Sequence, residues 1–347
     1  MGYSRFLFVG FLLVVSAVGP ADAGEKWVEL VANHPLVKTP FGLDFLPGGD
    51  AVLADFGGHR IVRITPAGQV SLIAGKGTKG AADGVGDAAE FNAPHNVCVG
   101  PAGMIYVSDT SNHRVRKIDP NTRVVTTIAG SAKGFAGDGG PAEKALFNEA
   151  YHVAMDGPEG LLVADLQNRR IRRIDLKKGT IATVVGNGKK GPFVEGAPAL
   201  EAVLTDPRAC ARGGDGSLWI LERGGNCLRR VGVDGVARTV VGTGKPGPIG
   251  DGPAASATLR SPKFFWTATG DGSLWIADSS NHAIRRLDPQ FKELTTILGT
   301  GTSGKGEVNQ QPRSLALKHP HGVSIDSQGD VWVSDSENGR ILRRVKE

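Results

Sequence analysis

The sequence lacks most of the features that would identify a familiar enzyme class. It has three cysteines in 347 residues, Cys98, Cys210 and Cys227, and a disulfide framework would need more. No G-x-S-x-G, H-E-x-x-H or G-x-x-x-x-G-K-[ST] motif occurs. Short G-x-G pieces at 75–77 and 242–244 have no βαβ pattern around them, so dinucleotide binding is not expected.

Long apolar runs are also missing, except for one at the N-terminus. Phe6 to Val18 follow Arg5 and precede the small-x-small sequence Ala21-Asp22-Ala23, an arrangement typical of a secretory signal peptide. The run is short for a membrane span, and a retained N-terminal anchor is the alternative. We expect residues 1–23 to be removed, which predicts a secreted or periplasmic protein without membrane attachment after cleavage.

Charge of one sign is not concentrated anywhere in the chain. The formal net charge is +5, from 40 Lys and Arg against 35 Asp and Glu, and the two signs are interspersed. No basic block appears, and no aromatics alternate with the arginines to stack bases, so nucleic acid is not an expected partner. Glycine is abundant instead, with 50 residues, roughly twice average usage, as expected of many tight turns.

A repeat occupies nearly all of the remaining sequence. Each copy contains an apolar triplet, a turn, a β-branched or aromatic run ending in an acidic residue, an Arg-rich strand and a fourth strand. This is the pattern of one four-stranded propeller blade. The acidic "hinge" residues are spaced 54 to 57 residues apart: Asp55, Asp109, Asp165, Glu222, Asp278 and Asp335. The Gly-rich linkers contain a DG-P-A-x-x-A-x-L stretch, expected to form a turn and a short helix over one face of the disc.

The two ends of the chain predict how the ring closes. The last copy stops at Glu347 after three strands, whereas 26–32 matches a fourth strand that lacks its first three. Pairing the two would remove exposed edges. We therefore expect an all-β, monomeric, six-bladed propeller over 24–347, closed by the strand at 26–32. The expected blades cover approximately 40–91, 92–147, 148–204, 205–259, 260–317 and 318–347.

The motif V-x-D-x-x-N-x-R-I resembles the NHL repeat. It occurs here as Val107-Ser108-Asp109, Asn112 and Arg114-Val115, and the resemblance covers nearly all of the chain after residue 23. It implies a six-bladed NHL-type propeller. It does not imply one activity, because such propellers serve as binding platforms, lyases and hydrolases.

Residues repeated in every copy are expected to be structural. The hinge acids and the asparagines after them should bond nearby backbone N–H groups, since a metal-binding ring of carboxylates would have to converge on the axis. We expect aromatics to pack between blades, and the paired arginines of the third strands to face outward or pair with hinge acids. The thiols should be buried and unpaired, with a 210–227 bridge as the alternative. The asparagines are Asn112, Asn168, Asn226, Asn281 and Asn338, the aromatics Tyr106, Trp219, Trp275 and Trp332, and the arginines include Arg172-Arg173 and Arg285-Arg286.

Residues that differ between copies are the candidates for a site. The first strand of each blade should line the channel, and polar groups among aromatics there would form a ligand pocket. The expected first ring is Phe41, His95, Tyr151, Arg208, Phe264 and His321, and the second is Gly42, Asn96, His152, Ala209, Phe265 and Gly322. The ligand-binding candidates are His95, Asn96, Tyr151, His152, Arg208, Phe264 and His321.

Two of these residues resemble a known metal site. Pro94-His95 and Pro320-His321 are similar to the first-strand Pro-His of peptidyl-α-hydroxyglycine α-amidating lyases, propellers whose channel zinc is held by histidines. The resemblance implies His95 and His321 as ligands of zinc or calcium. The third alternate blade offers Arg208, which cannot bind a metal, so a third ligand would have to be His34, His152 or His319. Two imidazoles alone make a poor zinc site.

Three functions follow from these residues. The first is a binding platform for a small molecule or peptide at the channel mouth, with Arg208 as an anion anchor. The second is a metal-dependent lyase or hydrolase, amidating-lyase-like or lactonase-like, although Asn96 is the one lactonase-type side chain in the two rings. The third is a scaffold that binds protein partners through its Gly-rich loops. Binding is the preferred prediction, and no residue is assigned a catalytic role.

Overall fold

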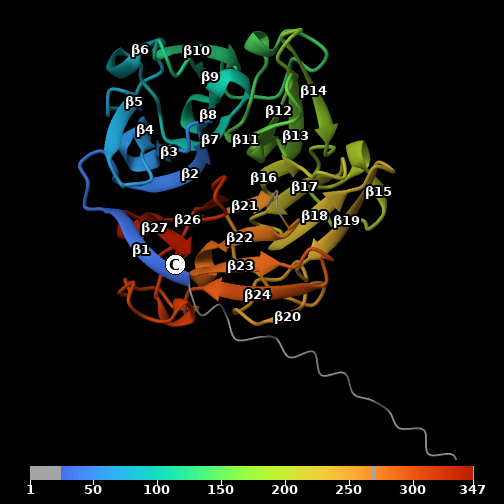
Figure 1. The fold of residues 1–347 in the computed structure, drawn as a ribbon. Helices are drawn as coiled ribbons and strands as arrows, with labels where there is room; N and C mark the ends of the chain where they lie inside the picture. Colours follow the sequence, from blue (N-terminus) through green and yellow to red (C-terminus); the bar gives the residue numbers. More distant parts are fainter. Residues whose placement is uncertain (1–24, 268–270, 347) are drawn as a thin grey trace, which may run out of the picture.

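The chain forms six antiparallel sheets arranged around a central axis (Figure 1). The structure, a computed structural model, describes residues 25–267 and 271–346. Its helices are three-residue 3-10 turns, and none in the described part is long and apolar enough to span a membrane. The predicted all-β, six-bladed propeller is confirmed.

Each blade runs from an inner strand at the axis to an outer strand at the rim (Figure 1). Blade 1 consists of β2 (Pro40–Phe45), β3 (Ala51–Asp55), β4 (Arg60–Ile64) and β5 (Val70–Ala74). Blade 2 consists of β7 (Pro94–Val99), β8 (Ile105–Asp109), β9 (Arg114–Ile118) and β10 (Val124–Ala129). Blade 3 consists of β11 (Ala150–Met155), β12 (Gly160–Asp165), β13 (Arg170–Asp175) and β14 (Thr180–Val185).

The other three blades continue around the ring in chain order. Blade 4 consists of β16 (Pro207–Arg212), β17 (Leu218–Glu222), β18 (Cys227–Val231) and β19 (Val236–Val241). Blade 5 consists of β21 (Phe264–Thr267), β22 (Leu274–Asp278), β23 (Ala283–Leu287) and β24 (Glu293–Leu298). Blade 6 consists of β25 (Gly322–Ile325), β26 (Val331–Asp335), β27 (Arg340–Lys346) and, from the other end of the chain, β1 (Glu25–Ala32).

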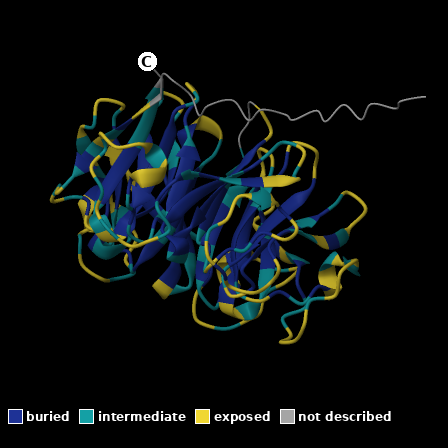
Figure 2. Cartoon of the chain, turned by 90° about the horizontal axis from the view of Figure 1, so that it is seen from below, coloured by how far each residue is buried: buried dark blue, intermediate teal, exposed yellow. Residues whose placement is uncertain are grey.

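Packing between blades forms the core. Second strands such as β8 and β12 are buried along their whole length, because a neighbouring blade covers each face. Figure 2 shows these buried strands inside the disc, with exposed loops around them. Tyr106 packs with Val153 and Leu161 of blade 3, and Trp332 packs with Leu43 of blade 1. The predicted packing of these aromatics between blades is confirmed.

The N-terminal strand closes the ring. β1 pairs antiparallel with β27, with Val28 opposite Arg343 and Ala32 opposite Arg340 (Figure 1). Trp27 of β1 is buried in the cluster that contains Trp275 of blade 5. Closure by an N-terminal strand is therefore confirmed. The predicted signal peptide, 1–23, lies outside the described residues and stays a prediction.

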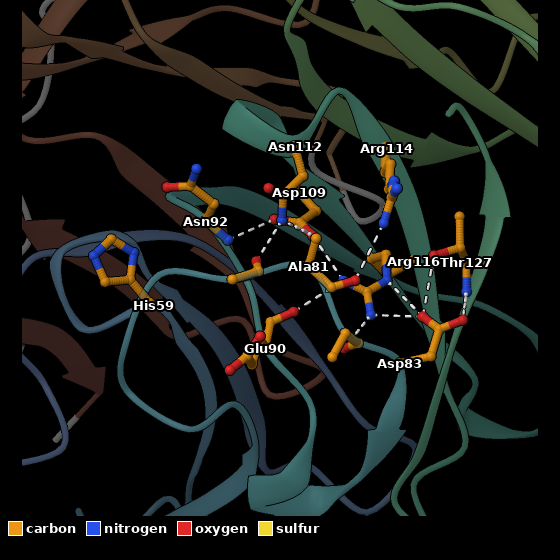
Figure 3. A network of polar contacts seen from close by, with 12 residues as sticks. His59, Ala81, Asp83, Glu90, Asn92, Asp109, Asn112, Arg114, Arg116 and Thr127 are labelled. Carbon is orange, nitrogen blue, oxygen red and sulfur yellow. Dashed lines mark hydrogen bonds and ion pairs between the residues drawn. The ribbon is translucent and has the colours of Figure 1, made fainter. Parts of the chain in front are cut away.

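A polar network surrounds the hinge acid, and Figure 3 shows it for blade 2. In blade 2, Asp109 accepts hydrogen bonds from the Asn92 backbone N–H (2.8 Å), the Asn112 amide (2.8 Å) and the Arg116 guanidinium (2.8 Å). Arg116 also pairs with Asp83 of the preceding linker at 2.6 Å. The structural role predicted for the hinge acids holds. Asn112 differs from the expectation, because its amide donates to the Gly80 carbonyl instead of accepting from an N–H group.

The sequence interpretation left two arrangements open for the arginines of the third strands, an outward-facing one and pairing with the hinge acids. The structure shows the second for Arg172 and Arg285: both are fully buried and pair with Asp165 (3.5 Å) and Asp278 (3.3 Å), because this position of the third strand points toward the hinge acid. Asn226 does not match the other asparagines, as shown below. The linker at 134–147 forms a turn and a short 3-10 helix, η5 (Ala142–Lys144), as expected, and three linkers also form two-residue edge strands that were not expected. These edge strands are β6 (Gly84–Val85), β15 (Ala197–Pro198) and β20 (Gly252–Pro253).

The three thiols are buried and unpaired, as predicted. Cys210 lies on β16 and Cys227 on β18, which flank β17 in the sheet. Burial raises the pKa of each thiol, so these cysteines are poor nucleophiles.

Candidate functional site

The predicted channel residues meet at one mouth of the channel. All seven candidates line one small pocket, together with Phe41 and one residue absent from the prediction, Lys263. The cavity measures about 10 Å³, room for about one water molecule. Side chains therefore fill most of the mouth, and only a compact group can enter without moving them.

Register shifts re-aim three of the six first-ring residues. The register of the inner strands shifts at His95 in β7, at Tyr151 in β11 and at Arg208 in β16. A bulged residue is left out of the ladder, and its side chain is re-aimed. The proline before His95 and Arg208 suits such a strand start, since it needs no N–H partner.

Stacked rings close the mouth. The Phe41 ring lies 3.9 Å from His321 at an interplanar angle of 8°, and 4.4 Å from Phe56 at 10°. The ring centroids of His95 and Tyr151 lie 4.1 Å apart, and Cζ of the Arg208 guanidinium lies 4.0 Å from the centroid of the Tyr151 ring. Phe56, which follows the hinge acid of blade 1, is the part of this stack that the strand alignment did not include.

His95 and His321 are neutral and share one tautomer. Nδ1 of His95 lies 3.3 Å from the Ala93 carbonyl, and Nδ1 of His321 lies 2.8 Å from the His319 carbonyl. A carbonyl only accepts, so Nδ1 carries the proton and Nε2 keeps a free lone pair. Burial, reinforced by the Arg208 charge, holds the pKa of both imidazoles well below its ordinary value.

Two cations dominate the electrostatics of the pocket. Arg208 is 5% exposed, and burial lowers its pKa to about 10. Burial and the nearby Arg208 charge lower the pKa of Lys263 to about 7. In the described part of the chain neither side chain has a carboxylate within ion-pair distance, and no Asp or Glu lines the pocket. Near neutral pH Arg208 is therefore charged and Lys263 is about half protonated, and the mouth presents positive charge with no carboxylate partner among the described residues.

Asn96 and His152, from the second ring, connect neighbouring inner strands. The Asn96 Oδ1 atom accepts from the Val153 N–H at 3.0 Å, and the His152 Nδ1 atom accepts from the Cys210 N–H at 3.5 Å. Burial lowers the pKa of His152 to about 3, so its ring is neutral and Nε2 carries the proton. That buried Nε2 has no partner among the described residues. Both residues hold blades together, and His152 retains one free donor.

Lys263 could have been found from the prolines. A proline directly precedes four of the first-ring residues: Phe41, His95, Arg208 and His321. In blade 5, Pro262 precedes Lys263. Counting back from the hinge acid selected Phe264 instead, because blade 5 has one more residue between Pro262 and Asp278 than blade 2 has between Pro94 and Asp109. Both residues line the pocket.

The pocket does not fit the zinc site that the amidating-lyase resemblance implies. Among the described residues, no three His, Cys, Asp or Glu side chains are grouped to hold a metal. His34 accepts from the Leu36 N–H, and His319 packs on His282 at 4.5 Å. His152 lines the pocket, but its Nδ1 accepts from the Cys210 N–H and its Nε2 is protonated. Arg208 and Lys263 would repel a cation.

A wider chamber lies further along the same channel. It measures about 170 Å³ and shares Asn96, His152 and Phe264 with the pocket. Met155 and Trp266 are among its apolar lining residues. The channel therefore has a narrow cationic mouth and a wider, more apolar chamber.

Comparison with known proteins agrees with this fold. A family model of the NHL repeat matches residues 91–118 and 317–343. NHL repeat-containing protein 2 of Bos taurus is 28% identical over 322 residues, covering 84% of this chain and 44% of that protein. The chain thus spans less than half the length of the relatives named NHL repeat-containing protein 2 that it matches.

Solved structures show the same architecture. A protein of unknown function from Bacteroides thetaiotaomicron has a TM-score of 0.69 at 14% identity, covering 93% of this chain and 76% of that one. An auxiliary nutrient binding protein from Bacteroides ovatus has a TM-score of 0.68 at 15% identity, covering 93% and 77%. The fold is therefore that of a six-bladed β-propeller. With the repeat match and the relatives, this chain is an NHL-repeat propeller.

Proposed function

We propose that this propeller is a binding protein for a small molecule or peptide that presents an anionic group to the channel mouth. One observation carries the proposal: the Arg208 cation and the Lys263 amine line a buried pocket without a carboxylate partner in the described part of the chain. A buried, unpaired charge is costly. A ligand carboxylate or phosphate would remove that cost and gain charge-assisted hydrogen bonds.

The other pocket residues suit binding more than catalysis. The free Nε2 atoms of His95 and His321 can accept hydrogen bonds, Tyr151 holds the Arg208 guanidinium in place, and Phe264 supplies an apolar wall. The small volume admits the anionic end of a ligand, with the remainder outside the mouth. A binding role also agrees with the auxiliary nutrient binding protein that shares the fold.

Calorimetry with simple anions tests the proposal. Citrate, inorganic phosphate and a tripeptide with a free carboxylate would be titrated into the protein, with the C-terminally amidated tripeptide as the uncharged counterpart. We expect Arg208→Gln to weaken binding by about 10–100-fold, because a hydrogen bond to a charged group contributes about 1.5–3 kcal/mol. Arg238→Gln, at an exposed arginine paired with Asp234, is the control and should bind each anion as tightly as the unmodified protein.

Metal analysis separates this proposal from the metal-dependent lyase or hydrolase. Elemental mass spectrometry of the purified protein would be compared with that of the His95→Ala, His321→Ala double variant. Near-stoichiometric zinc or calcium that disappears in the variant would favour the metal-dependent enzyme. If no anion binds, or if Arg208→Gln binds the anions as tightly as the unmodified protein, the channel site is contradicted and the interaction scaffold remains.

A further inference from the structure

A large groove lies in blade 4, away from the channel. It measures about 560 Å³ and is lined by 14 residues that include Gly191, Phe193, Glu195, Gly225 and Cys227. We call it the blade 4 groove. Its walls are the linker before the blade, the loop between β17 and β18, and the segment after β19.

In blade 3, two side chains fill the equivalent space. Asn168, three residues after the hinge acid, donates to the Gly134 carbonyl at 2.7 Å. Arg170, five residues after the hinge acid, donates to the Asn187 carbonyl at 2.8 Å. A Cβ atom on Gly188 would lie 2.0 Å from this guanidinium, so the arginine occupies the space above that glycine.

The same filling recurs around the ring. In blade 2, Asn112 donates to the Gly80 carbonyl and Arg114 to the Ala81 carbonyl (Figure 3). In blade 6, Asn338 donates to the Gly304 carbonyl. Arg340 donates to the Gly306 carbonyl and also pairs with the hinge acid Asp335 at 2.7 Å. Blades 1 and 5 each keep one of the two side chains, Arg60 and Asn281 respectively.

Blade 4 has neither side chain. The residues three and five positions after Glu222 are Gly225 and Cys227. The residues that match Gly134, Asn187 and Gly188 are Gly191, Thr243 and Gly244, and all three line the groove. Their backbone therefore borders open space where the other blades place an amide, a guanidinium or both.

The groove also carries an exposed acid. In blade 4, Glu195 and Glu222 share Arg229 in the described part of the chain, at 3.9 and 3.0 Å, as the linker acid and the hinge acid share one arginine in blades 2 and 3. Arg229 also lies 3.5 Å from the Phe193 ring. Glu195 accepts hydrogen bonds from the N–H and hydroxyl groups of Thr239, yet its side chain is 60% exposed, more than the equivalent acids of blades 2 and 3, which are 49% and 34% exposed.

We propose that the blade 4 groove binds an arginine side chain from a peptide segment of a partner protein. The guanidinium replaces the arginine that other blades supply, donates to the backbone carbonyls at Gly191 and Thr243, and neutralises Glu195. A planar guanidinium suits this combination of carbonyls and carboxylate. Val194, between the groove residues Phe193 and Glu195, is 61% exposed and offers an apolar contact to the residues beside the arginine. This site is independent of the channel mouth.

The first test compares two small probes. Nα-acetyl-arginine amide and Nα-acetyl-citrulline amide have nearly the same shape, but only the first is charged. Saturation-transfer NMR should show that the arginine probe binds at least about tenfold more tightly, since this difference equals one charge-assisted interaction of about 1.4 kcal/mol. Equal binding of the two probes, or no transfer from the arginine probe, would overturn the proposal.

The second test fills the groove. Cys227→Arg restores the repeat arginine and should abolish binding of the arginine probe. The matched control is Ala283→Arg in blade 5, which adds an arginine at the same repeat position elsewhere and should leave binding unchanged. If Cys227→Arg does not fold, Glu195→Gln removes the exposed charge and should weaken binding severalfold. Unchanged binding of the arginine probe to the folded variants would contradict the proposal. Arg208→Gln, in the channel mouth, should not change binding of this probe.

Discussion

Blades 2 and 4 share four strands and a buried acid–arginine pair, but they differ in what surrounds that pair. Asp109 of blade 2 receives the Asn112 amide as well as the Arg116 guanidinium. Glu222 of blade 4 receives the Thr205 N–H at 2.9 Å, Arg229 at 3.0 Å and the weak Cys227 thiol donor at 3.5 Å. Both blades nevertheless close the same ring. The acid–arginine pair is therefore enough for the scaffold, and the side chains around it are free to change.

Removing the hinge acid should show the largest difference between the two blades. We expect Asp109→Ala to lower the free energy of unfolding by about 3–5 kcal/mol, because it leaves the buried Arg116 short of a partner. Glu222→Ala should cost at least about 1 kcal/mol less, since no asparagine hydrogen bond is lost with it. Denaturant unfolding of the two variants checks this, and an equal or larger loss for Glu222→Ala would contradict the comparison.

Exchanging the residue at the asparagine position should have a smaller effect. Asn112→Gly removes hydrogen bonds to Gly80 and Asp109, and we expect a loss of about 1–2 kcal/mol. The reverse change, Gly225→Asn, should raise the free energy of unfolding by less than that. A Cβ atom added at Gly225 would lie 2.3 Å from Oε2 of Glu222, so the longer acid of blade 4 occupies the space that the amide needs.

Thermal and denaturant melts of both variants measure this asymmetry. The control is Asn121→Gly, because Asn121 lies in an exposed turn of blade 2, away from the hinge network. A gain in blade 4 as large as the loss in blade 2 would show that the two environments are equivalent.

The fold could be predicted from the sequence because the same strand pattern occurs in six copies. The hinge acids, the inter-blade aromatics and the closing strand each follow from one rule applied to every copy. Asn226 shows where the rule fails. Counted by residue type it matches Asn112, but in the structure it takes the position of His113, with a positive φ of 47°. The loop of blade 4 has glycine at the asparagine position. The offset is present in the sequence, because Asn112 is three residues after its hinge acid and Asn226 is four residues after Glu222, but matching by residue type passed over it.

The channel site was predictable as a set of residues but not as a shape. Spacing placed His95, Tyr151, Arg208 and His321 on one ring, and they line one pocket. The stacking that narrows the pocket to about 10 Å³ depends on rotamers and bulges that no spacing encodes. Likewise, the burial of Arg172 could not be read from an alternating pattern that looks the same for a solvated strand.

The smallest expected difference between blades 2 and 4 is in pH dependence. His113 has a positive φ of 55°, and its Nδ1 accepts a hydrogen bond from the Glu149 N–H of blade 3 at 3.1 Å. Burial lowers the pKa of His113 below its ordinary value of 6.5, with Lys133 adding to the shift and Glu149 opposing it. Asn226 makes the equivalent bond to the Ser261 N–H at 2.9 Å and does not titrate there.

The sign of the effect follows from the lowered pKa. Below pH 6.5 the unfolded chain takes up a proton at His113 before the folded chain does, so the stabilisation present at higher pH is lost as the pH falls through that window. The lost hydrogen bond is worth about 1 kcal/mol. His113→Asn should remove this part of the acid sensitivity, and Asn226→His should add a similar part to blade 4. Unfolding midpoints measured from pH 8 down to pH 5 test both changes, and identical pH profiles for wild type and His113→Asn would refute the assignment.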